Sequence, residues 1–131
     1  MSAVLEFMNY GKKKVADYAN IKLNDNEKTA RIVLNDDFFD LFKNDSVEVL
    51  LIMMNTLFYR YSMQYNNWSV NFDKESHEKS MVMMKKNKSN KFERNKLLMI
   101  SYFQESFRSS AIDDFKESVQ LVREFIEQME K

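Results

Sequence analysis

Hydrophobic positions recur with their clearest regularity near the C-terminus of the chain. They step by three and four residues, in the order Ile112, Phe115, Val119, Val122, Ile126 and Met129. This heptad spacing predicts a helix that opens near Ser110, runs to the C-terminus and has an apolar stripe along one face. Leu121 and Phe125 lie outside the stripe, so the helix has more apolar surface than one core contact requires. Two arrangements remain open: the stripe packs inside the monomer, or it pairs with a second copy in a homodimer.

A second strong pattern lies in residues 46–64, which contain the run VEVLLIMMNTLFYRYSM. This run is apolar almost all the way round a helix, and such a helix is buried on most sides. We therefore expect it to be the central element of the fold. Asp45, followed three residues later by Glu48, predicts a capping box at its N-terminus.

Asn, Asp and Ser supply the other helix starts, because their side chains accept hydrogen bonds from the first backbone N–H groups of a helix. Asn35 opens a short acidic helix, and Asp73 opens a helix that ends near Lys86. Besides the two helices described above, helices are predicted at residues 3–20, 36–43, 73–86 and 90–109.

Residues 21–34 are compatible with two structures. Apolar and polar residues alternate in both halves of this segment, which favours a short β-hairpin. Asn24 and Glu27, however, also form the pattern that opens a short helix. A similar alternation at residues 68–72 allows one short strand.

These elements predict an all-α or nearly all-α fold. We expect one compact domain of residues 1–131, a bundle of about five or six helices around the buried helix 46–64. A minor β-hairpin near residues 21–34 is the one expected departure from helix.

Composition narrows the candidate chemistry. The 131 residues include one glycine, Gly11, one histidine, His77, and neither proline nor cysteine. Phosphate-binding loops and nucleophile elbows need several glycines, because glycine adopts positive φ at little cost. The lack of cysteine excludes disulfides, thiolate nucleophiles and cysteine-based metal sites.

The remaining titratable residues favour ordinary structural roles. His77 has serine neighbours, but adjacent positions on one helix rarely reach the geometry of a catalytic triad, so a surface role is favoured. Asp36, Asp37 and Asp40 are explained by the preference of helix N-termini for negative charge, without a metal ion. We predict no catalytic residue, no metal site and no cofactor.

The largest charge asymmetry lies in residues 79–96, although the whole chain has 20 basic and 20 acidic residues. A lysine-rich helix end followed by a polar loop is most simply a solvated surface. The same charges also suit the phosphates of a nucleic acid or the carboxylates of an acidic partner protein. The candidate residues for this binding are Lys85, Lys86, Lys88, Lys91, Arg94 and Lys96.

Methionines precede this basic segment at positions 81, 83 and 84. They cannot all face one core, because residues i and i+2 point apart on a helix. We expect Met83 at the surface or in an interface, where methionine adapts well to partners, and Met81 and Met84 in the core. The predicted partner or dimer interface consists of Met83, Val119, Leu121, Val122, Phe125, Ile126 and Met129.

These patterns favour a non-enzymatic helical module, interacting or regulatory, that binds a partner protein. A homodimer is a further expectation, and nucleic-acid binding through residues 79–96 is the alternative function. The longest apolar run, residues 49–54, is far shorter than the roughly 18 residues of a membrane span, so we expect a cytoplasmic protein without membrane contact. The heavy use of Lys, Asn, Ile and Phe is typical of A/T-rich coding sequences and suggests a low-GC bacterium, a phage or a large DNA virus. We expect the module to come from a phage, a virus or a mobile element.

The nucleic-acid alternative has a direct test. If the lysines of residues 79–96 contact phosphates, affinity for DNA or RNA falls steeply with salt, with a log–log slope of about −0.7 to −0.9 per contact. We expect charge reversal at Lys86 and Lys88 to abolish binding without unfolding the protein. Fluorescence anisotropy at several salt concentrations measures this, and the absence of any binding at low salt would contradict the alternative.

Overall fold

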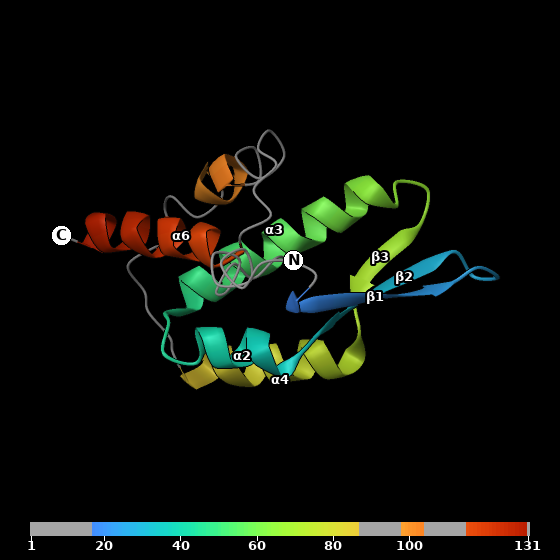
Figure 1. The fold of residues 1–131 in the computed structure, drawn as a ribbon, viewed down its shortest axis with the longest axis horizontal. Coiled ribbons are helices and arrows are strands. Elements are labelled where there is room, and N and C mark those ends of the chain that lie inside the picture. Colours follow the sequence, from blue (N-terminus) through green and yellow to red (C-terminus); the bar gives the residue numbers. More distant parts are fainter. Residues whose placement is uncertain (1–16, 87–97, 104–114, 131) are drawn as a thin grey trace, which may run out of the picture.

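The structure of the protein is a computed structural model that describes residues 17–86, 98–103 and 115–130. The elements follow in the order β1 (Ala19–Asn24), β2 (Thr29–Leu34), α2 (Asp36–Phe42), α3 (Val47–Gln64), β3 (Ser69–Phe72), α4 (Lys74–Lys86) and α6 (Phe115–Glu130). Residues 98–103 are also helical and are orange in Figure 1. The prediction of an all-α fold is wrong, because the mostly helical structure contains a three-stranded sheet.

The sheet has the strand order β1-β2-β3, so β2 is the central strand (Figure 1). β1 and β2 are antiparallel, with Ile21 opposite Ile32. β2 and β3 are parallel, with Ala30 opposite Val70. The connection between these parallel strands contains α2 and α3, and α3 contacts β3 while α4 contacts β2.

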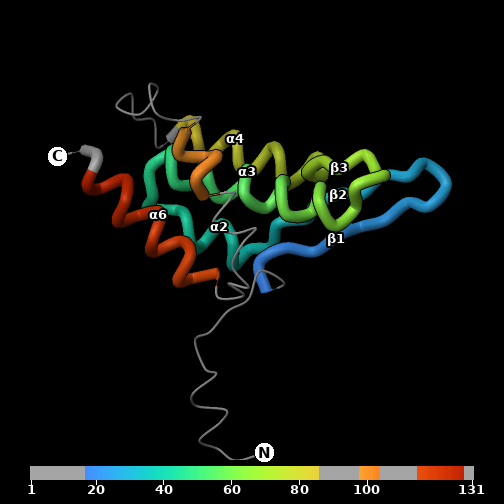
Figure 2. Tube along the Cα trace, turned by 90° about the horizontal axis from the view of Figure 1, so that it is seen from above, coloured from blue at the N-terminus to red at the C-terminus, as the bar shows by residue number. Residues whose placement is uncertain are grey.

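The alternation in residues 21–34 produces the hairpin and not the helix. The Asn24 side chain accepts hydrogen bonds from the backbone N–H groups of Asn26 and Glu27, both at 3.1 Å, so it closes a turn. Lys28 completes the turn in the left-handed region, with φ of 54°. In both views the hairpin tip lies at the opposite end of the molecule from the C-terminal end of α6 (Figure 1, Figure 2).

β3 is the strand that turns the hairpin into a sheet. Val70 is buried and lies beside the buried Ala30 of β2. The Ser69 backbone N–H donates to the Lys28 carbonyl oxygen at 2.8 Å, and the Lys28 ammonium lies 5.0 Å from the centre of the Trp68 ring. The alternation at 68–72 is therefore a real strand signal, although a strand of four residues is stable only with its distant partner.

α3 is buried along most of its first half, as expected for the central helix. Its buried residues are Glu48, Val49, Leu50, Ile52, Met53, Met54, Thr56 and Leu57. The Thr56 hydroxyl donates to the Ile52 carbonyl oxygen at 2.7 Å, which satisfies a polar group inside the core.

The predicted capping box at the start of α3 is wrong. The N-cap residue is Ser46, and the Asp45 backbone N–H donates to the Phe42 carbonyl oxygen at 3.0 Å, so it is not bound by Glu48. Among the described residues, the buried Glu48 has no hydrogen-bond donor for its Oε2 atom. The Asp45 carboxylate is instead engaged by Arg123 of α6.

The caps predicted for α2 and α4 are confirmed. The Asn35 side chain accepts a hydrogen bond from the Phe38 backbone N–H at 3.1 Å, and the Asp73 carboxylate accepts one from the Ser76 backbone N–H at 2.9 Å. Each side chain satisfies a backbone donor that has no partner within its own helix.

α6 packs its apolar stripe inside the monomer, which is one of the two arrangements left open by the sequence. Phe115, Val119, Val122 and Ile126 are all buried, and the helix contacts α3. The Phe115 ring centre lies 4.6 Å from that of Tyr18 and 6.2 Å from that of Phe42. Ile112 lies outside the described residues, and nothing is described for the Met129 side chain.

A charged contact joins α6 to the turn between α2 and α3. The Arg123 guanidinium donates from Nε and Nη2 to the two oxygens of the Asp45 carboxylate, at 2.8 and 2.6 Å. Its Nη2 also donates to the Leu41 carbonyl oxygen at 2.8 Å. Because the ion pair is bidentate and partly buried, it fixes the orientation of α6 relative to the turn between α2 and α3 as well as holding the two together.

The core can be tested at Leu57, which is 1% exposed. We expect Leu57→Ala to lower the free energy of unfolding by about 2–5 kcal/mol, since it removes buried methyl groups and leaves a cavity. Leu121→Ala is the control, because Leu121 is 45% exposed and should change stability by less than about 1 kcal/mol. Urea denaturation measures both, and equal effects would show that α3 is not the centre of the core.

Candidate functional site

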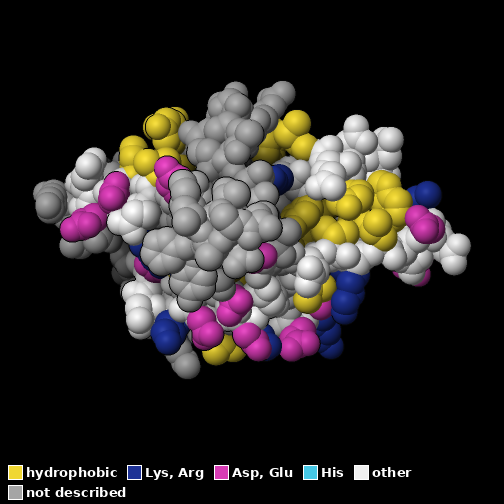
Figure 3. All heavy atoms as spheres, in the orientation of Figure 1, with side chains coloured by type: hydrophobic (Ala, Val, Ile, Leu, Met, Phe, Trp, Pro, Cys, Tyr) yellow, Lys and Arg dark blue, Asp and Glu magenta, His cyan; other side chains and the backbone are white. Residues whose placement is uncertain are grey.

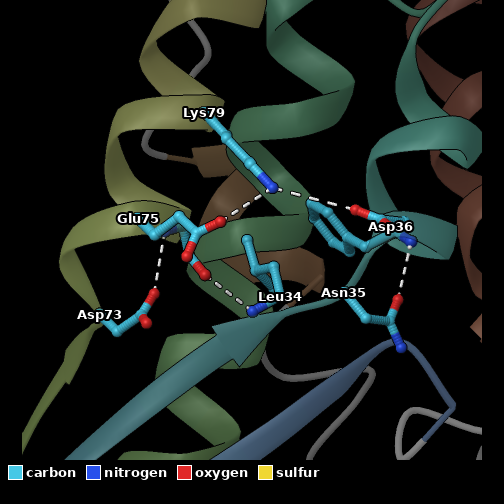
Figure 4. A network of polar contacts seen from close by, with 8 residues as sticks. Leu34, Asn35, Asp36, Asp73, Glu75 and Lys79 are labelled. Atoms are coloured by element: carbon cyan, nitrogen blue, oxygen red, sulfur yellow. Dashed lines mark hydrogen bonds and ion pairs between the residues drawn. The ribbon is translucent and has the colours of Figure 1, made fainter.

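α4 is positioned by hydrogen bonds between its first turn and the end of β2 (Figure 4). The Asp73 backbone N–H donates to the Ile32 carbonyl oxygen at 2.9 Å. The Leu34 backbone N–H donates to the buried Ser76 hydroxyl at 2.8 Å, while the Ser76 backbone N–H donates to Asp73. These contacts set the direction in which α4 leaves the sheet, and α4 is the wall shared by two surface grooves.

The electrostatics of this junction favour an ionised Asp73. Partial desolvation on its own raises the pKa of the Asp73 carboxyl, but hydrogen bonds from the Ser76 hydroxyl and backbone N–H lower it, with help from Lys22 and Lys79. The net effect is a pKa below the usual value, so the N-cap of α4 is charged at neutral pH.

The first groove lies between α2 and α4 and has an open volume of about 630 Å³. We call it the acidic groove, and its lining residues are Asp36, Phe39, Asp40, Lys43, Glu78, Lys79, Val82 and Met83. Figure 3 shows acidic side chains, with Lys and Arg and a few hydrophobic atoms among them, along the lower edge of the molecule, where Figure 1 places α2 and α4. The groove thus combines an apolar surface with three carboxylates and two lysine ammonium groups.

Lys79 bridges the two helices that form the acidic groove (Figure 4). Its ammonium lies 3.1 Å from a Glu75 carboxylate oxygen and 3.9 Å from one of Asp36. The hydrogen bond and the charge of Glu75 raise the pKa of Lys79, and the charges of Asp36 and Asp73 add to this effect. Lys79 therefore already has carboxylate partners within the protein.

The second groove lies between α3, β3 and α4 and has an open volume of about 390 Å³. We call it the methionine groove, and its lining residues are Leu51, Met54, Asn55, Phe58, Asn71, Phe72, His77, Ser80, Met81 and Met84. Among the lining residues that the structure describes there is no Asp, Glu, Lys or Arg. Met81 and Phe58 are 43% and 37% exposed, so apolar side chains are open to a binding partner.

The methionines of α4 are arranged differently from the prediction. Met81 is exposed, which corrects its expected place in the core. Met83 and Met84 are both partly buried and pack against the core, each at the wall of one groove. The exposed residue next to Met81 is Val82, which lines the acidic groove.

The predicted interface on α6 does not form one continuous surface. Val119, Val122 and Ile126 are buried within the monomer, whereas Leu121 and Phe125 are exposed. A dimer built on the three buried residues would require α6 to leave the core. Phe125 stacks on Tyr102 with ring centres 5.8 Å apart, so part of its surface is used within the chain.

The predicted basic segment falls mostly outside the described residues. Lys85 is exposed near the end of α4, and Lys86 is the last residue of that helix, with no description of its side chain. The remaining candidates, Lys88, Lys91, Arg94 and Lys96, all lie outside the described residues. The nucleic-acid alternative therefore remains a prediction.

His77 is exposed on α4 and lines the methionine groove. The Ser80 hydroxyl donates to the His77 carbonyl oxygen at 2.8 Å, and the Ser76 hydroxyl accepts from Leu34. Both serine neighbours of this histidine are thus engaged with the backbone. Within the described part of the chain, no three or more His, Asp or Glu residues are grouped so as to hold a metal ion.

The acidic groove was missed by sequence reasoning. The acidic residues of α2 were explained as N-terminal helix charges, and nothing in the local pattern indicates that Glu78 of α4 lines the same groove as Asp40. The available signal was the run of four apolar residues at positions 81–84, because four consecutive residues on a helix cannot all face the core.

Comparisons with known proteins gave no match to a family model, to a curated protein or to a solved structure. In the described residues, no helix has the length and apolar character needed to cross a bilayer.

The cap of α4 provides a test of how this site is positioned. We expect Asp73→Ala to lower the free energy of unfolding by about 1 kcal/mol, since it removes the acceptor for the Ser76 backbone N–H. Asp73→Asn is the matched variant, because it keeps an oxygen acceptor and removes only the charge.

The pH dependence of that comparison follows from the lowered pKa of Asp73. A carboxyl whose folded-state pKa is below its unfolded value stabilises the fold fully above about pH 4, and this contribution is lost as pH falls through the folded-state pKa. We expect the difference between wild type and Asp73→Asn in urea denaturation to shrink in acid. A difference that is independent of pH would show that the charge of Asp73 does not stabilise α4.

Proposed function

We propose that the protein is a non-enzymatic interaction module and that the methionine groove binds an apolar segment of a partner protein. The observation that carries this proposal is the exposure of Met81 and Phe58 in a groove whose described lining residues include no Asp, Glu, Lys or Arg. Burial of such side chains against a partner is favourable by roughly 25 cal/mol for each Å² of apolar surface removed from water.

The chemistry of the lining supports an apolar peptide as the occupant. Methionine side chains are flexible and polarisable, so they adapt to partner side chains of different shape. A charged occupant would lose its hydration without gaining an opposite charge, which disfavours it. Asn55, Asn71 and His77 add polar groups that can form hydrogen bonds with the backbone of a peptide.

The hydrogen bonds of the two serine hydroxyls near His77 support a binding role for the groove and not a catalytic one. A nucleophilic serine needs a neighbouring base within hydrogen-bond reach and a third group that orients that base. Here the hydroxyls of Ser76 and Ser80 bond to the backbone, and His77 is exposed. We therefore assign the groove a role in recognition.

The test compares partner capture by the wild type and by Met81→Glu, in extracts of the source organism with and without nuclease treatment. We expect a specific protein to co-purify with the wild type and to be reduced about tenfold or more with the variant, because the substitution introduces an unpaired charge into the interface. Quantitative mass spectrometry of the captured proteins measures this reduction.

Leu23→Glu is the matched control, because Leu23 is exposed to a similar degree, at 49%, and lies on β1 outside the groove. It should leave capture unchanged, and thermal melting should show both variants to be folded. Equal loss with the two variants, or capture that disappears on nuclease treatment, would contradict the proposed function.

A further inference from the structure

We infer that the acidic groove is a second docking site, which takes a cationic segment of a partner protein with an apolar side chain between its Lys or Arg residues. This groove lies on the other side of α4 from the methionine groove, shares no lining residue with it and does not depend on the function proposed there.

The groove contains exposed apolar side chains that a partner could cover. Val82 is 54% exposed, and Phe39 and Met83 are partly buried beside it. Because binding is favoured in proportion to the apolar area removed from water, covering such an exposed side chain contributes favourably to the free energy of binding. The open volume of about 630 Å³ is within the range of roughly 300–1,000 Å³ that ligand sites offer, so a few residues of a peptide fit there.

The charges of the groove select a cationic occupant. Asp40 on α2 and Glu78 on α4 line the groove, and neither forms an ion pair with any residue that the structure describes. Two lysines also line the groove: Lys79 is held by Glu75 and Asp36, and Lys43 has its own interaction within the protein. A bound cationic group therefore meets carboxylates that have no ion-pair partner among the described residues.

Phe39 already has a cation near its ring. The Lys79 ammonium lies 5.8 Å from the centre of the Phe39 ring, within the range of a cation–π contact. The Phe39 ring therefore offers the occupant apolar surface, beside the side chains of Val82 and Met83. The groove thus offers a cationic segment both carboxylates and an aromatic surface.

The experiment uses the full chain and a short fluorescent peptide made of lysine and leucine, with a glutamate–leucine peptide of the same length as the charge control. We expect the lysine peptide to bind and the glutamate peptide not to bind. The double variant Asp40→Asn, Glu78→Gln should weaken binding by about fivefold to tenfold, because it removes two exposed partners of the bound cations. Fluorescence anisotropy measures the affinities.

The matched charge control is the double variant Asp25→Asn, Glu27→Gln at the hairpin tip. It also removes two negative charges, but from exposed positions that do not line the groove. We expect it to leave the affinity within about twofold of the wild type, since exposed charges beyond about 10 Å are largely screened at physiological salt.

The apolar contact is tested separately by Val82→Ser, with Leu23→Ser as the control of similar exposure. We expect about fivefold weaker binding for Val82→Ser and no change for Leu23→Ser. Equal effects of the groove and hairpin variants, or equal binding of both peptides, would overturn the proposal. A change from monomer to dimer that depends on Asp40 and Glu78 in sedimentation equilibrium would also overturn it, because the occupant would then be a second copy.

Discussion

The buried hydrogen bond from the Leu34 backbone N–H to the Ser76 hydroxyl is the contact on which the arrangement of this fold depends. β2 is the central strand, but its pairing with β3 ends at Ile32 and Phe72. Beyond that point β3 offers no acceptor to the Leu34 backbone N–H, and the Ser76 hydroxyl accepts this hydrogen bond instead. A buried N–H without an acceptor would destabilise the fold. α4 therefore has to start where β3 ends, and both grooves follow from its position.

Features whose hydrogen bonds are local could be predicted from the sequence. Asn35 and Asp73 cap α2 and α4 as expected, because each bonds a backbone N–H three residues later. The sheet and the start of α3 depend on residues far away in the chain. β3 is defined by its pairing with β2, and Arg123 of α6 engages the Asp45 carboxylate that was expected to cap α3. Local patterns contain no information about such partners.

The same limit explains why the grooves were only partly foreseen. The methionine run of α4 predicted that some apolar side chains would stay outside the core, but Met81 and Val82 are the exposed ones. Which side chains are covered depends on where α3 and β2 contact α4. The acidic groove depends further on Lys79, whose contacts with Asp36 and Glu75 link α2 to α4.

The late position of α6 in the chain has a consequence for synthesis on the ribosome. Phe38 and Phe42 of α2 pack against Phe115, and the Asp45 carboxylate is bound by Arg123. Both partners emerge from the ribosome only after residues 17–86. Until then the nascent chain exposes aromatic surface that favours aggregation or capture by chaperones. α6 covers this surface once it has emerged and packed against α2.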